Sequence, residues 1–355
     1  MNSEDIHTSV PDPNKAIDRS IPDFPVAKEV DDNDYFTKNT PPTYIHEVVS
    51  KVKDFLQYHK ANTFKKIALI TSGGTTVPLE NNTVRFIDNF SAGTRGSTSA
   101  EILLKNGYAV IFLYREFSLL PYSRHFSHNL HFLDYMKINS IDNKIEINDD
   151  HNDKMYKILL DYQKIKDSNS LLIIPFTTVN QYLFTLKSIS TTLNTYGSKS
   201  LIYLAAAVSD FFIPVSKLPQ HKIQSSVNNL SSNGQLIINL DPVPKFLKRI
   251  VDDWSNNSLI ISFKLETDQN ILINKAKLAL KRYNHNLVIG NLLQTRKKEV
   301  VFVSKSSNES NQIDKNAQEK WFRLTDDQIK NNFEIEEIFL PEVIKLHDLW
   351  INKTN

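Results

Sequence analysis

The chain contains no cysteine among its 355 residues. This absence excludes disulfide bonds, cysteine-bound zinc and a thiol nucleophile. The chain also has no run of about 18 consecutive apolar residues, so we expect no membrane-spanning helix and no membrane partner. Its first residues, MNSEDIHTSVPDPNK, form neither a secretory signal nor an arginine-rich transit peptide. We therefore expect a cytoplasmic protein, with the nucleus as the alternative location.

An excess of charge of one sign is absent as well. The formal net charge is +2, and no block of lysine and arginine marks a basic arm. A chain of this kind exerts no general attraction on nucleic acid, so we expect no nucleic-acid partner.

Glycine is scarce, yet four of the eight glycines lie in one short stretch, as Gly73, Gly74, Gly93 and Gly96. A short apolar run at 67–70 predicts a strand before them, and apolar residues at helical spacing from Ser97 onward predict a helix after them. A glycine loop that leads into a helix presents backbone N–H groups and the positive end of the helix dipole, which bind phosphate. The stretch matches neither G-x-G-x-x-G nor the P-loop pattern. A strand-end turn followed by a loose helix entry therefore explains these glycines equally well.

Strands and helices alternate along most of the chain. Short apolar runs predict strands at 67–70, 108–114, 171–175, 201–205, 259–263, 286–289 and 299–304. Apolar stripes predict helices at 43–62, from 97, at 153–166, after a cap at Thr177, and at 244–254, 271–283 and 334–353. Strand–helix–strand units build a parallel sheet, so the sequence predicts an α/β fold with helices flanking the sheet.

Two segments stand apart from this pattern. Residues 1–41 are rich in proline, aspartate and asparagine, and we expect them to form a flexible or surface-draped N-terminal arm outside the core. Residues 42–355 are expected to form a single domain. Within it, 221–226 and 236–240 flank a turn-rich gap and predict a hairpin flap at about 215–242. Such a flap closes over a site or pairs with another subunit.

Small or polar residues follow three of the predicted strands, as Ala206 and Asp210, Phe263 and Glu266, and Gly290 and Asn291. The carboxyl ends of parallel strands meet at one edge of a sheet and face its ligand crevice. The sequence therefore predicts a binding site at that edge. For Asp210 an alternative is a turn-capping aspartate, and for Lys222, on the flap, a solvated lysine.

Five phrases together carry a resemblance to a known family: TSGGTTVPLE, VRFIDNFSAGTRG, LAAAVSDFFIPVSKLPQHKIQSS, ISFKLETD and VIGNLL. In order and spacing, over roughly residues 43–350, the chain resembles eukaryotic phosphopantothenoylcysteine synthetase, the phosphopantothenate–cysteine ligase of coenzyme A biosynthesis. The resemblance implies a Rossmann-like parallel sheet with a mixed edge, and a homodimer. It also implies phosphopantothenate and L-cysteine as substrates, with ATP or CTP as co-substrate together with Mg²⁺. The protein ligands of the metal are left unknown.

The reaction that the resemblance implies has two steps. The phosphopantothenate carboxylate attacks the α-phosphate of the nucleotide and releases pyrophosphate, and the cysteine amine then opens the acyl-nucleotide to give phosphopantothenoylcysteine and a nucleoside monophosphate. The covalent chemistry belongs to the substrates, so the protein supplies orientation and charge compensation. Its candidate cations are Arg85, Arg95, Lys222, Lys245 and Lys264.

Residue roles follow from the same resemblance. The nucleotide is expected to contact Gly73, Ser91, Gly93, Gly96, Phe263 and Asn291. Phosphopantothenate is expected to contact Asn89, Ala206, Ala207 and Asp210, with Arg85 reaching in from the second subunit. The expected catalytic residues are Asn89, Asp210 and the flap lysine Lys222. The bacterial relatives carry a lysine-rich K-x-K-K at the flap, whereas this chain has Gln224 and Ser225 after Ile223.

Some alternatives stay open at this stage. Glu266 and Thr267 are either Mg²⁺-side ligands or a cap for the helix that follows, and His221 is expected to be a surface residue. The rival functions are an NAD(P)-dependent Rossmann oxidoreductase and a catalytically silent scaffold that pairs with other coenzyme A enzymes. Release of pyrophosphate from phosphopantothenate and nucleotide separates the ligase from both. The choice between ATP and CTP is not determined.

Overall fold

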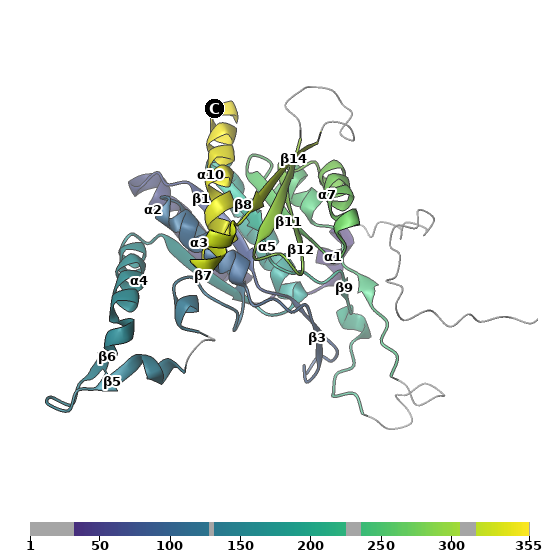
Figure 1. Ribbon diagram of the computed structural model, residues 1–355. Helices are drawn as coiled ribbons and strands as arrows, with labels where there is room; N and C mark the ends of the chain where they lie inside the picture. The colour runs from purple at the N-terminus through teal and green to yellow at the C-terminus, as the bar shows by residue number, and fades with distance from the viewer. Residues whose placement is uncertain (1–31, 128–130, 225–235, 306–316, 355) are drawn as a thin grey trace, which may run out of the picture.

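An eight-stranded sheet forms the centre of the molecule (Figure 1). The computed structural model describes residues 32–127, 131–224, 236–305 and 317–354. The strands lie in the order β14-β13-β12-β11-β8-β1-β4-β7. Their bounds are β1 Ile67–Ser72, β4 Ala109–Arg115, β7 Leu171–Phe176, β8 Ser200–Leu204, β11 Leu259–Glu266, β12 Leu287–Leu292, β13 Glu299–Ser304 and β14 Gln318–Arg323.

Strands β7, β4, β1, β8, β11 and β12, in their order in the sheet, are all parallel. Strands β13 and β14 run antiparallel to their neighbours. Numbered by their order in the chain, the parallel strands occupy the sheet as 3-2-1-4-5-6, the doubly wound Rossmann order. The chain direction across the sheet reverses between β1 and β8, and ligands of such sheets bind at this switch point. The predicted fold class, with its mixed edge, is confirmed.

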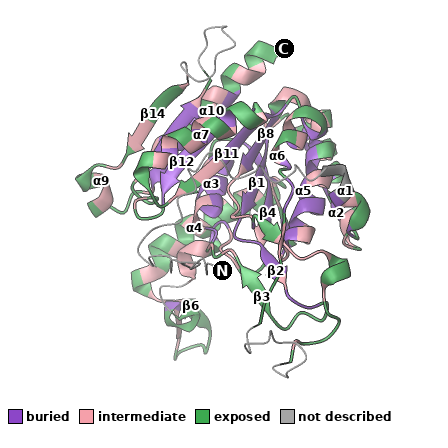
Figure 2. Ribbon diagram, turned by 90° about the vertical axis from the view of Figure 1, so that its right-hand side faces the viewer, coloured by how far each residue is buried: buried purple, intermediate pink, exposed green. Residues whose placement is uncertain are grey.

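Helices cover both faces of the sheet, and the strands between them are buried (Figure 2). One core joins α2 and α5 to β1, β4 and β7, and a second joins α3 and α10 to the other face of β1 and β4 and to β8, β11, β12 and β13. A third, smaller core packs α7 on β12 and β13. The helices are α2 Ile45–Asn62, α3 Thr94–Lys105, α4 Asp149–Asp167, α5 Val179–Leu193, α6 Leu247–Arg249, α7 Gln269–Tyr283, α9 Asp326–Lys330 and α10 Ile335–Thr354.

The predicted arm of residues 1–41 differs from the structure at its end. Residues 32–38 form helix α1 (Asp32–Lys38), and its Tyr35 is 3% exposed. The Tyr35 ring packs on Phe184, Phe212 and Phe246, and its hydroxyl donates to Asn180 at 3.0 Å. This part of the chain therefore belongs to the core. Residues 1–31 lie outside the described residues.

The flap follows β8 but lacks the predicted hairpin strands. The described residues 221–224 and 236–240 contain no strand, and residues 225–235 lie outside the described part. A short antiparallel pair instead forms at its base, between β9 (Phe211–Phe212) and β10 (Asp241–Pro242). The pair forms there because Phe212 packs on the hydrophobic core. Leu236 and Ile237, in contrast, are exposed and have no apolar surface to pack against.

Two further differences concern the edges of the fold. Strand β14 falls in a segment for which the sequence predicts no strand, since its letters QEKWFR lack an apolar run. The cap of α5 is Thr178, which accepts from the backbone N–H of Gln181 in a capping box, and not Thr177. No helix in the described ranges is both long and apolar enough to cross a membrane.

A helix and a hairpin project from the sheet edge at β7 (Figure 1). They are α4 and the pair β5 (Met136–Ile138) and β6 (Ile145–Ile147). Helix α4 has no buried residue along its length.

Candidate active site at the carboxyl edge of the sheet

The loops that follow β1 and β8 pair with each other at the switch point. The backbone N–H of Thr75 donates to the carbonyl of Ala207 at 3.1 Å, and the N–H of Ala207 donates to the carbonyl of Gly73 at 2.8 Å. The pairing continues as a parallel bridge between Gly74 and Ala207. The predicted nucleotide residue Gly73 and the predicted substrate residue Ala207 are thus neighbours.

Threonine hydroxyls fix the small-residue run after β8. Thr71 Oγ1 accepts from the N–H of Ala206 at 3.2 Å, and Thr75 Oγ1 accepts from the N–H of Ser209 at 2.9 Å. Both threonines are fully buried. The run therefore has a fixed backbone, as a surface that a ligand must approach closely requires.

Asn89 lies directly against the glycine loop. The stretch between Gly74 and Ser91 folds back as a two-stranded ribbon of β2 (Thr76–Pro78) and β3 (Phe86–Asp88). The N–H of Asn89 then donates to the carbonyl of Thr75 at 3.1 Å. A Cβ atom on Gly74 would lie 1.6 Å from the carbonyl oxygen of Asn89, so only glycine allows this approach.

Helix α3 starts immediately beyond the end of β1. Its N-cap is Gly93, with φ +84°, and no side chain caps the helix. A Cβ on Gly96 would lie 2.4 Å from Ser72 Oγ, and Ser72 Oγ donates to the carbonyl of Gly93 at 3.1 Å. The helix entry is therefore tight, which the loose-entry interpretation does not explain. The uncapped first turn leaves backbone N–H groups for an anion.

The residues predicted for the base and sugar lie on adjacent strands. Phe263 on β11 packs edge-on against Tyr203, with ring centroids 5.0 Å apart, and Asn291 on β12 is buried. Close by, Glu266 contacts Lys264 at 3.3 Å and Lys275 at 3.2 Å. The cap of α7 is Asp268, so neither Glu266 nor Thr267 has the capping role considered for it.

Asp210 carries a well exposed carboxylate at the start of the flap. Its Oδ1 accepts from Lys245 Nζ at 2.6 Å. The turn is held by the adjacent serine, whose Oγ accepts from the N–H of Phe211 at 3.3 Å. The turn-capping alternative for Asp210 therefore does not match the structure, in which Ser209 has that role.

A buried carboxylate that the sequence did not reveal joins the ribbon to the flap. Glu80 is fully buried and accepts from the N–H groups of Arg85, Val84 and Ile223 and from the Arg85 guanidinium at 3.0 Å. These bonds, led by that from the Arg85 N–H, hold the pKa of Glu80 below its usual value. Arg85 also donates to the carbonyl of Ile223 at 3.1 Å, next to the exposed Lys222 and His221.

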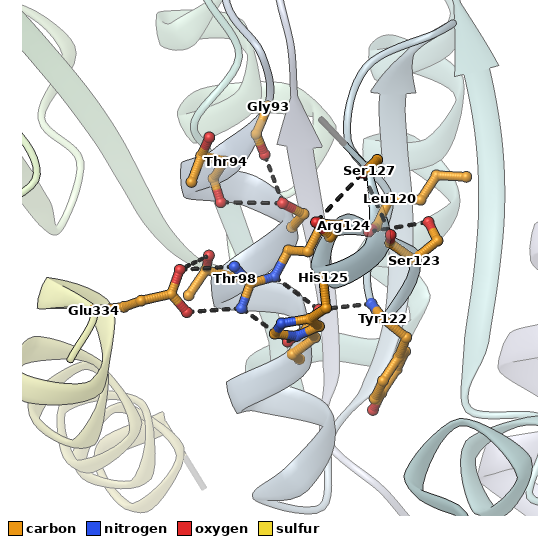
Figure 3. A network of polar contacts seen from close by, with 12 residues as sticks. Gly93, Thr94, Thr98, Leu120, Tyr122, Ser123, Arg124, His125, Ser127 and Glu334 are labelled. Carbon is orange, nitrogen blue, oxygen red and sulfur yellow. Dashed lines mark hydrogen bonds and ion pairs between the residues drawn. The ribbon is translucent and has the colours of Figure 1, made fainter. Parts of the chain in front are cut away.

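Helix α3 is clamped by a second ionic network (Figure 3). The Arg124 guanidinium bridges Glu101 on α3, at 2.8 Å and 3.0 Å, and Glu334 before α10, at 2.7 Å for each oxygen. Glu101 also binds His125 at 2.9 Å and the N–H of Tyr122 at 2.6 Å. No sequence pattern indicates this network, because its members come from three separate segments.

No group of three or more histidine, aspartate or glutamate side chains in the described ranges is arranged to bind a metal ion. Glu266 and Asp210 are neutralised by lysines.

Comparison with known proteins places this geometry in a family. The model of the DNA/pantothenate metabolism flavoprotein C-terminal domain matches residues 185–333. Phosphopantothenate–cysteine ligase CAB2 of Saccharomyces cerevisiae is 50% identical over 99% of this chain and 96% of its own length. The human phosphopantothenate–cysteine ligase is 39% identical over 82% of this chain and 89% of its own length. This chain belongs to the phosphopantothenate–cysteine ligase family.

The solved structures agree with that assignment. A Cab2 variant matches with a TM-score of 0.82 and 52% identity, over 92% of this chain and 100% of its own. The same variant in complex with phosphopantothenate-cysteine matches with a TM-score of 0.81. The suspected family is thereby confirmed, and family membership disfavours the oxidoreductase alternative.

The structure brings most of the predicted site residues together. Backbone contacts and the hydroxyls of Thr71 and Ser72 join Gly73, Gly93, Gly96, Asn89, Ser91, Ala206 and Ala207 around the end of β1. Phe263 and Asn291 lie on the neighbouring strands β11 and β12, which pair in parallel register. Asp210 and Lys222 are exposed on the flap side. Arg95, a candidate phosphate ligand, is instead bound to Glu336 at 2.7 Å.

The Glu101 network predicts a specific pH dependence of stability. Burial raises the pKa of Glu101, but hydrogen bonds from His125 and Arg124 outweigh this and lower it to about 2. A lowered carboxylate pKa stabilises the fold above the unfolded value and is lost as the pH falls through the folded value. The free energy of unfolding should thus fall by about 3 kcal/mol between about pH 4.5 and pH 2 through this group.

Urea denaturation at a series of pH values measures this effect. We expect Glu101→Gln to be less stable near neutral pH and to show a flatter pH dependence in the acid window. Glu146→Gln, at an exposed glutamate of β6, is the control and should retain the wild-type slope. Equal slopes for Glu101→Gln and wild type would contradict the assignment.

Proposed function

We propose that this protein joins phosphopantothenate to L-cysteine, with a nucleoside triphosphate that activates the carboxylate as an acyl-nucleotide and releases pyrophosphate. The observation that carries this proposal is the pairing of the glycine loop with the small-residue run at the switch point. The pairing supports the proposal because the uncapped start of α3, which we propose binds phosphate, then lies beside the small-residue run, which we propose binds the organic acid. The names of the yeast and human relatives support the same reaction.

Phosphopantothenate and the nucleoside triphosphate are both anions, so the site needs a cation close to the reacting groups. Arg95, Lys245 and Lys264 are each paired with a carboxylate of this chain. Lys222 is exposed and has no ion-pair partner among the described residues. We therefore assign to Lys222 the stabilisation of charge on the acyl-phosphate, and to the Asn89 amide the binding of the intermediate.

The test is an assay that supplies phosphopantothenate, cysteine and Mg²⁺ with ATP or CTP in separate reactions. The proposal expects pyrophosphate and phosphopantothenoylcysteine with at least one nucleotide. Pyrophosphate release without cysteine would show that activation precedes amide formation. Failure to release pyrophosphate with either nucleotide would instead support the scaffold alternative.

Asp210 is predicted to bind phosphopantothenate. Asp210→Asn should raise the KM for phosphopantothenate about tenfold, the effect of losing a hydrogen bond to a charged group. The KM for the nucleotide and the Tm should stay close to wild type, because the carboxylate is exposed and paired with one lysine. The control is Asp348→Asn on α10, which breaks a similar ion pair between Asp348 and Lys66. A lowered Tm with unchanged KM would show a structural role only.

Lys222 is predicted to act in turnover. Lys222→Ala should lower kcat about a hundredfold, since a lost donor to a developing oxyanion typically costs that much. The nucleotide KM should change little. Lys60→Ala, at another exposed lysine with no ion-pair partner among the described residues, should leave steady-state kinetics unchanged. A kcat near the wild-type value in Lys222→Ala would remove the catalytic assignment.

We propose further that the protein is a homodimer and that Arg85 acts across its interface. Strand β3 pairs only with β2 among the described strands, so its other edge is open. Exposed apolar side chains surround it, with Phe86 51% and Phe90 88% exposed. An open strand edge flanked by apolar residues is typical of an interface between identical subunits.

Phe86→Ser tests this interface. We expect this variant to sediment as a monomer where the wild type sediments as a dimer. The variant monomer should still unfold cooperatively as a folded protein, because the Phe86 side chain is exposed and not part of the core. Phe333→Ser, at a phenylalanine of similar exposure between α9 and α10, should leave the dimer intact. A monomeric wild-type protein, or a Phe86→Ser variant that stays dimeric, would be inconsistent with this surface as the interface.

A further inference from the structure

Arg95 connects the two halves of the proposed nucleotide site. It is the second residue of α3 and lies between Gly93 and Gly96, at the predicted phosphate end. Its guanidinium leaves this helix start and lies 5.8 Å from the centre of the Phe263 ring. It also donates to the carbonyl of Arg296, in the turn after β12, the strand that carries Asn291. One side chain therefore contacts both the predicted base residue Phe263 and the turn that follows the strand of Asn291.

The position of this guanidinium is fixed from the far side. Its Nη1 donates to Glu336 Oε1 at 2.7 Å, and the two side chains are only 16% and 7% exposed. The Phe339 ring lies 5.8 Å away on the side of α10. A planar guanidinium with a buried carboxylate, a carbonyl and two aromatic rings as neighbours has little freedom to turn.

We propose that Arg95 is the positioning residue that sets the Phe263 ring relative to the phosphate-binding start of α3 and thereby determines which nucleotide base is preferred. The inference rests on the proposed function and deepens it. Arg95 acts through Phe263 and the turn at Arg296, because its Nη1 donates to Glu336 and its Nη2 donates to the Arg296 carbonyl, both within the protein. We therefore assign it to positioning of Phe263 and not to binding of the triphosphate.

The chain provides a matched control in Arg124. This arginine also ties α3 to the start of α10, through Glu101 and Glu334 (Figure 3). It makes no described contact with Phe263 or with the turn at Arg296. A change at either arginine thus loosens the contact between α3 and α10. Only a change at Arg95 is expected to displace the Phe263 ring as well.

The experiment compares Arg95→Lys and Arg124→Lys, which keep the charge but lose the planar fork of donors. Binding of non-hydrolysable ATP and CTP analogues is measured by isothermal titration, and Tm by calorimetry. We expect Arg95→Lys to weaken the preferred analogue about tenfold, because a displaced Phe263 ring loses part of its stacking on the base, and to narrow the ratio of the two affinities. Arg124→Lys should lower the Tm at least as much and leave that ratio unchanged.

A double variant tests whether the effect passes through Phe263. Phe263→Leu should narrow the affinity ratio by itself, and adding Arg95→Lys should then change it no further, since residues that act together are not additive. Phosphopantothenate affinity should be unchanged in all three variants. Such a pattern is not produced by a general loss of stability.

The assignment would be overturned by an unchanged affinity ratio in Arg95→Lys, by an equal change in Arg124→Lys, or by equal affinity of the wild type for both analogues. Because binding is measured without turnover, failure of the ligase assay does not imitate any of them. A wild type that discriminates between the analogues through Arg95 but forms no amide would overturn the proposed function alone. A wild type that binds neither analogue would overturn both.

Discussion

The backbone pairing between the loops after β1 and β8 is the constraint on which the rest of the site depends. In a doubly wound sheet these two loops leave the switch point in opposite directions and form a crevice. Here the hydrogen bonds between Thr75, Ala207 and Gly73 close the floor of that crevice. Buried threonine hydroxyls then fix the run at Ala206. The small residues serve close approach of backbone to backbone, and with it close approach of a ligand to both.

The helix start that we propose as the phosphate site is useful only if it stays in place, because orientation is the protein's main contribution to a reaction whose covalent chemistry belongs to the substrates. Two arginines hold α3 against α10 through buried or half-buried carboxylates, Arg95 with Glu336 and Arg124 with Glu101 and Glu334. Removing one partner of such a pair leaves an uncompensated charge inside the protein, which is costly. The ionic framework around α3 therefore favours rigidity on the side of the nucleotide, while the flap side at Asp210 and Lys222 remains exposed.

Most of the fold followed from the sequence because buried parallel strands are short apolar runs and their crossover helices carry one apolar stripe. The failures have physical causes. Tyr35 looks like part of a polar arm, and its burial depends on Phe184, Phe212 and Phe246, which are far away in the chain. Strand β14 reads as polar because it lies at the sheet edge, with much of its surface exposed. The flap strands were expected from local alternation, but exposed residues such as Ile237 have no apolar face to bury against.

By itself the sequence determined the succession of the parallel strands and their crossover helices, the family, and the residues that gather at the carboxyl edge, since all of these are written in local runs and phrases. Only the tertiary structure decided what the arginines do. Arg85, Arg95 and Arg124 are alike as sequence letters, and their roles were set by Glu80, Glu336 and Glu334. The Arg95 pair spans 241 positions. Ion pairing depends on distance in space, and no periodicity in the chain encodes a contact of that separation.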